Sequence, residues 1–199
     1  MNRYFPTWLM SMLLLTGCAL KPSQPSTFYV LNVEPNSDNS IEQGKPLHLG
    51  LGPLVMPDLL DRPQIVTRTA TNEVQLAEFH RWGGELHPEV LRLLAQNLMA
   101  RLHTDYVAYY PWIDEQPLDV KLGVRIFRFD GELAKNVVLD GVLSLEDAKV
   151  SCGATMTGFH IEVPTSDESY SAIVRAMSLS LGKLSDEIAS RVREMKKGC

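Results

Sequence analysis

The stretch that decides the fold reads Leu118-Asp119-Val120-Lys121-Leu122-Gly123-Val124-Arg125-Ile126. Apolar side chains occupy every second position and alternate with polar residues or glycine. Successive side chains of a β-strand point to opposite faces of a sheet. The alternation therefore predicts a strand with one buried face and one open face.

Similar segments lie on both sides of this strand. Their aromatic and aliphatic side chains predict further strands at residues 28–33, 47–51, 65–69, 73–77, 106–110, 137–145 and 148–163. We expect Pro53 to end the second of these strands and Asp130-Gly131 to form a turn after the central strand. The segments 65–69 and 73–77 flank Ala70-Thr71-Asn72, which indicates a hairpin.

Two segments carry apolar side chains at helical spacing. The first begins near Pro88, and its apolar stripe consists of Val90, Leu91, Leu94, Leu98 and Leu102. The second follows Thr165-Ser166-Asp167-Glu168, which has capping-box spacing, and its stripe consists of Val174, Met177, Leu181, Leu184, Ile188, Val192 and Met195. We expect this stripe to pack on the sheet, with a subunit interface as the other use. The order of elements predicts an α/β or α+β domain, with a single mixed sheet and two main helices packed on it.

The N-terminus has the pattern of a lipoprotein signal. Arg3 precedes a short apolar run that ends in Leu15-Thr16-Gly17-Cys18, the order called a lipobox. The run is shorter than the ~20 residues that a membrane-spanning helix needs, so it predicts a cleaved secretory signal. We expect residues 1–17 to be the signal peptide, 18–27 the acylated Cys18 and a flexible linker, and 28–199 a periplasmic domain.

The residues after Cys18 predict where the protein is anchored. Position 19 is Ala rather than the Asp that retains enterobacterial lipoproteins at the inner membrane, which favours the outer membrane. Residues 19–27 are rich in Pro and Ser and have nothing to bury. The ten residues from Cys18 to Phe28 reach at most ~33 Å when extended. We expect the domain to face the periplasm and to stay close to its membrane.

Charge and cysteine content narrow the function further. The chain has 19 Lys and Arg against 24 Asp and Glu, a formal net charge of −5, with no basic run that would suit nucleic acid. Besides Cys18 there are two cysteines, Cys152 and Cys199. An exported chain meets an oxidising compartment. The two cysteines therefore either form an intramolecular disulfide, or Cys199 pairs between molecules, or Cys152 is buried and inert.

No residue pattern indicates catalysis. The five histidines, at positions 48, 80, 87, 103 and 160, have no Cys or second His at metal-ligand spacing. The sequence contains neither the nucleophile elbow of hydrolases nor a phosphate-binding loop with its Lys-Ser/Thr pair. We therefore expect no enzymatic activity, no bound metal and no cofactor.

Two local segments are unusual. One runs from Pro57 to Arg68, and the other from Ala77 to Trp82. Arg81-Trp82, before two glycines, would put a planar cation and a large aromatic ring on a loop, which suits a partner interface. The alternative is that Trp82 belongs to the core and Arg81 is solvated.

These segments, in this order, resemble the PqiC/YmbA family of ABC-type transport auxiliary lipoproteins. The similar pieces are Phe28-Tyr29-Val30-Leu31, Arg62-Pro63-Gln64-Ile65-Val66, residues 78–82, residues 124–131 and Asp186-Glu187-Ile188-Ala189. The chain departs from the family in Arg81-Trp82-Gly83-Gly84-Glu85-Leu86, where members often have Arg-Trp-Ala-Glu-Pro-Leu.

The resemblance implies a role in lipid transport between the two membranes. It implies a non-catalytic outer-membrane lipoprotein that docks an inner-membrane-anchored MCE protein and supports membrane integrity, and some members of the family assemble as homo-oligomeric rings. The alternative is a structural envelope lipoprotein that holds an assembly or cell-wall complex without handling lipid. An enzyme acting on envelope lipids or peptidoglycan is the third hypothesis.

Overall fold

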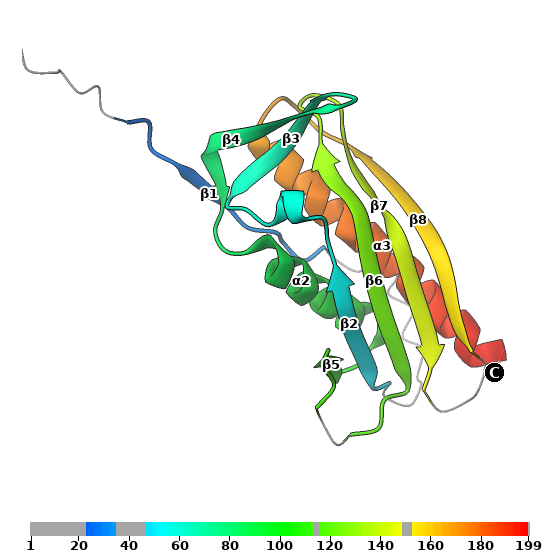
Figure 1. Ribbon diagram of the computed structural model, residues 1–199. Helices are drawn as coiled ribbons and strands as arrows, with labels where there is room; N and C mark the ends of the chain where they lie inside the picture. Colours follow the sequence, from blue (N-terminus) through cyan, green and yellow to red (C-terminus); the bar gives the residue numbers. More distant parts are fainter. Residues whose placement is uncertain (1–22, 35–46, 114–115, 149–152, 199) are drawn as a thin grey trace, which may run out of the picture.

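The sheet and its two helices form the architecture that the sequence predicts. The computed structural model describes residues 23–34, 47–113, 116–148 and 153–198. These residues form one mixed sheet of eight strands, and two α-helices lie together against one of its faces (Figure 1). The expected fold class, an α+β domain with a single mixed sheet, is therefore confirmed.

Three long antiparallel strands form the main part of the sheet. They are β6 (Val120–Gly131), β7 (Asn136–Asp147) and β8 (Ala154–Pro164), in that order. The predicted alternation is confirmed, since Val120, Leu122 and Val124 are buried while the residues between them face the open side. The prediction of a turn at Asp130-Gly131 is wrong. β6 continues through both residues because Asp130 forms ion pairs within the sheet, and the chain reverses at residues 132–135 instead.

The other edge of β6 is shared by two groups of strands. β2 (Leu49–Val55) runs parallel to the first half of β6 and to β5 (Val107–Tyr109). The end of β6 meets β3 (Gln64–Ala70), which forms the expected hairpin with β4 (Glu73–Trp82). The sequence predicts that β2 ends at Pro53, and this is wrong, because β2 continues to Val55. The ladder shifts its register between Leu51 and Leu54, so a residue without an N–H is accommodated there.

The first predicted strand is shorter than expected. β1 (Thr27–Tyr29) pairs in parallel with the end of β4, and the chain then leaves the sheet. Leu31 is buried in the core, and the Asn32 N–H donates to Ser178 Oγ at 3.1 Å. After β1, residues 31 and 32 are therefore held by the core and by α3 rather than by the sheet.

Both helices bury their predicted apolar stripes. α2 (Leu86–Leu102) begins two residues before Pro88, and its Val90, Leu94 and Leu98 have no exposed surface. α3 (Tyr170–Gly198) packs on β6, β7 and β8 and on α2, which confirms that its stripe covers the sheet. Burying a large aliphatic side chain stabilises the fold by roughly 1.5–3 kcal/mol.

The predicted capping box of α3 is wrong. The helix starts at Tyr170, and the cap is Ser169, whose Oγ accepts the Ala172 N–H at 3.1 Å. Thr165 instead donates its backbone N–H to Lys135 O at the end of the sheet. The cap therefore forms four residues later than its sequence signal.

Candidate functional site

The open face of the sheet is the face that the two helices leave uncovered. On this face β6 and β8 carry Lys121, Arg125 and His160, which alternate with the buried residues of the same strands. Exposed apolar side chains accompany these charges. Val55 on β2 is 42% exposed and Met156 on β8 is 73% exposed. Phe127 is the extra residue of a bulge between Ile126 and Arg128 and is 58% exposed.

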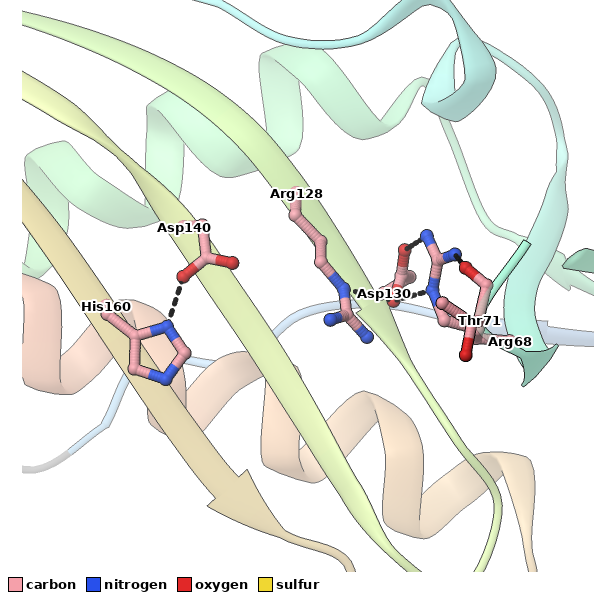
Figure 2. A network of polar contacts seen from close by, with 6 residues as sticks. All are labelled: Arg68, Thr71, Arg128, Asp130, Asp140 and His160. Carbon is pink, nitrogen blue, oxygen red and sulfur yellow. Dashed lines mark hydrogen bonds and ion pairs between the residues drawn. The ribbon is translucent and has the colours of Figure 1, made fainter. Parts of the chain in front are cut away.

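A network of ion pairs joins β6 to β3 on the same side (Figure 2). The buried carboxylate of Asp130 accepts from Arg68 Nη2 at 2.8 Å and from Arg128 Nε at 2.9 Å. Arg68 also donates to Thr71 O at 3.0 Å in the hairpin turn. Hydrogen bonding to Asp130 raises the pKa of the Arg68 guanidinium. The two arginines satisfy a carboxylate that burial alone would destabilise, so this network fastens the hairpin to the main sheet.

Four of the five histidines have a structural partner. His160 contacts Asp140 across the open face (Figure 2), and His87 Nε2 lies 2.9 Å from Leu54 O. His48 Nδ1 lies 3.2 Å from Pro117 O, and His80 Nδ1 lies 2.8 Å from the Tyr29 hydroxyl. The fifth, His103, has left-handed backbone geometry and ends α2. Within the ranges that the structure describes, no group of three or more His, Cys, Asp and Glu residues could hold a metal ion.

Arg81 and Trp82 end β4 and do not lie on a loop. Trp82 is 5% exposed and belongs to the hydrophobic core, so the core alternative describes its position. Arg81 is partly exposed, and its Nε donates to Glu78 O at 3.2 Å. Of the two residues, only Arg81 has surface to offer a partner, and its role at an interface stays a prediction.

An aromatic cluster holds β1 in place. The Tyr29 hydroxyl and the His80 ring are hydrogen-bonded, and His80 stacks on Tyr170 with ring centroids 4.1 Å apart. Burial and the neighbouring Tyr170 raise the pKa of the Tyr29 phenol. This cluster joins β1, β4 and the start of α3.

The lipobox residues Leu15, Thr16, Gly17 and Cys18, and the cysteines Cys152 and Cys199, lie outside the described residues. The chain near the last two is nonetheless positioned. Asp147 ends β7, five residues before Cys152, and its carboxylate lies 2.7 Å from Nζ of Lys196, three residues before Cys199. The flanks of both cysteines therefore lie at one end of the molecule.

Sequence reasoning missed the Asp130 network and the pocket beside the short helix η1 (Asp58–Leu60). The unusual composition of the segment from Pro57 to Arg68 was the signal for the pocket. No local signal marks the pairing of Arg68 with Asp130, because the two residues are 62 positions apart.

The comparison with protein families decides where the chain belongs. The model of the ABC-type transport auxiliary lipoprotein component matches residues 29–189, which include β2 to β8, all of α2 and the first two thirds of α3. The chain belongs to this family. The resemblance seen in the sequence is thereby confirmed, and the family is described by a part in transport rather than by a reaction.

Solved structures share the fold of the auxiliary lipoprotein. The protein XCC0632 from Xanthomonas campestris is 15% identical, with a TM-score of 0.71 over 87% of this chain and 100% of its own. A crystal structure of an uncharacterized protein is 20% identical, with a TM-score of 0.67 over 85% of this chain and 99% of its own. A comparison with curated proteins finds no match. Among the described residues, no helix combines the length and the apolar character that crossing a membrane requires.

Proposed function

We propose that this protein is a non-catalytic, outer-membrane-anchored subunit of an MCE-type system that moves lipid between the two membranes. In this proposal Cys18 carries the acyl chains, residues 18–27 form the tether, and residues 28–199 dock the inner-membrane-anchored MCE protein. The observation that carries the proposal is the family match over residues 29–189.

The geometry of the tether supports an anchored docking part. The linker leads directly into β1, and the Tyr29, His80 and Tyr170 cluster fixes that strand. A folded domain on so short a linker stays close to its membrane and would meet the far end of a periplasm-spanning partner there. No reaction has to occur in the domain, because the energy of transport would come from that partner.

The test is purification of the full acylated chain from envelope extract, with mass spectrometry of the co-purifying proteins and lipids. The proposal expects an MCE protein, and expects a deletion strain to become sensitive to detergents. Capture of a cell-wall or assembly complex without an MCE protein, from a strain with an intact barrier, would replace the proposal with the scaffold alternative.

Two variants make this test specific. Cys18→Ala should leave unprocessed precursor or soluble periplasmic domain, and normal outer-membrane fractionation of that variant would show that acylation is not the anchor.

Arg81→Ala should lower capture of the partner while the melting temperature stays near that of the wild type. Unchanged capture would remove Arg81 from the interface.

A further inference from the structure

A pocket lies where β2 ends, η1 turns and α2 begins. Its volume is about 420 Å³. The buried side chains of Leu54 and Leu60 line it, together with Met56, Pro57 and Pro88. These side chains form an apolar part of the wall, but His87 also lines the pocket and more of the lining surface is polar than apolar. The pocket is large enough to admit a long side chain.

Three carboxylates surround this apolar wall. Asp58 and Asp61 come from η1 and the residue after it, and Glu85 comes from the residue before α2. Each of the three residues is exposed, and within the described ranges none of these carboxylates has an ion-pair partner. No Lys or Arg side chain lines the pocket. A cleft lined by charge of one sign concentrates the opposite charge.

The pocket continues onto the open face of the sheet. Val55 lines both the pocket and a shallow groove beside it. The groove is lined by the apolar side chains of Pro53, Val142 and Met156, and Arg125 adds a positive charge there. Val55 and Met156 are among the exposed large apolar side chains of the protein. Neighbouring exposed apolar side chains of this kind indicate an interaction surface.

We propose that this surface docks a segment of a protein partner. The segment presents a Lys or Arg side chain to Asp58, Asp61 and Glu85, and an adjacent apolar side chain to Val55 and Met156. Lys and Arg carry their charge on an aliphatic stem, so one side chain would contact the apolar wall and reach the carboxylates together. The inference rests on the proposed function, and it adds the surface and the chemistry of the partner.

Inside the pocket, where no Lys or Arg side chain lies, charge complementarity favours a protein over a phospholipid. An amine headgroup also offers an ammonium, but its phosphate would lie in the field of the same three carboxylates. Like charges at short range repel, and the repulsion is strongest where water is partly excluded. A Lys or Arg side chain brings a positive charge without that phosphate.

The experiment places a photo-crosslinking residue at position 55, which lines both the pocket and the groove. The full acylated chain with Val55→p-benzoylphenylalanine is irradiated in its native envelope, and the crosslinked peptide is identified by mass spectrometry. We expect a protein adduct whose peptide contains Lys or Arg. The triple variant Asp58→Asn, Asp61→Asn and Glu85→Gln should lower the adduct yield about tenfold, a loss equivalent to ~1.4 kcal/mol of binding.

A matched control separates the site from total charge. Glu73→Gln, Glu168→Gln and Glu194→Gln remove the same charge from three exposed carboxylates elsewhere, and the adduct yield should stay at the wild-type level. A second measurement leaves this chain unaltered apart from the probe. Exchange of the crosslinked Lys or Arg for Glu in the partner should lower the yield as the triple variant does, whether or not the triple variant folds.

Several results would overturn the inference. These are an equal yield in the triple variant, an adduct only with lipid or with a second copy of this chain, and a contact peptide without a basic residue. The proposed function fails separately. If an MCE protein co-purifies but the adduct yield does not depend on the three carboxylates, only the inference is wrong. If the adduct depends on them but its partner is no MCE protein and none co-purifies, only the transport proposal is wrong.

Discussion

The two faces of the same strands differ in what they contribute. On β6 and β7 the covered face presents Leu122, Val124 and Leu143, which are buried, and α3 packs on both strands. The open face of the same strands presents Arg125 and Ser144 with ion pairs beside them. The covered face depends on shape and burial, whereas the exposed apolar residues of the open face are not required by the core. Substitutions on the two faces should therefore separate stability from function.

The largest effect on stability should come from a covalent link between the end of β7 and the end of α3. Asp147 and Lys196 bring β7 and the end of α3 together. We therefore predict a disulfide between Cys152 and Cys199, which the chain-entropy model values at ~4 kcal/mol for a loop of this size. Mass spectrometry of non-reduced peptides from periplasmic material should find the bridged pair. Two free thiols would rule out the bridge.

Truncation within the covered face should cost nearly as much. Leu143 has no exposed surface and packs under the helices, so Leu143→Ala should lower the free energy of unfolding by about 3 kcal/mol. Met156→Ala on the open face is the control and should change it by less than about 0.5 kcal/mol. Urea titration measures both. Similar losses from the two variants would mean that the faces do not differ as described.

Two polar contacts on the open side should differ in their effect on stability because one is buried and the other is exposed. Asp130 is buried between two arginines, and Asp130→Asn should cost about 2 kcal/mol because the charge-assisted hydrogen bonds are lost. Asp140 pairs with His160 in an exposed position, so Asp140→Asn should cost less than about 0.5 kcal/mol. Thermal denaturation compares the two variants, and an equal effect would contradict the assignment of Asp130 as a structural residue.

The smallest effect should come from the start of α3. Ser169→Ala removes the observed cap and should destabilise the protein by about 1 kcal/mol. Thr165→Ala, at the cap that the sequence pattern indicates, should be nearly neutral. If the melting temperatures fall in the reverse order, α3 begins where the sequence pattern puts it.

The sequence predicts those features whose signal is local. The alternation in residues 118–126 and the stripe from Val174 to Val192 repeat with the periods of strand and helix, and both were confirmed. The turn at Asp130 fails because Arg68, far away in the chain, engages its carboxylate. Thr165 does not cap α3, because its backbone N–H bonds to Lys135 O at the end of the sheet and the helix starts only at Tyr170. Local signals give way where a distant residue offers a better partner.

The candidate site follows the same rule. Arg81-Trp82 stands out in the sequence because both residue types are common at interfaces, yet one of the two proved to be core. The acidic pocket was not predicted, because Glu85 meets Asp58 and Asp61 only through the packing of α2 against the end of β2. The composition around η1 is its only trace in the sequence.

The most direct test of the account is a complementation assay with a variant of the open face. Val55→Ser, Phe127→Ser and Met156→Ser, combined in one chain, remove exposed apolar side chains and leave the core intact. We predict a melting temperature close to that of the wild type and a strain that stays as sensitive to detergents as the deletion. A folded variant that restores full detergent resistance would contradict the assignment of function to the open face.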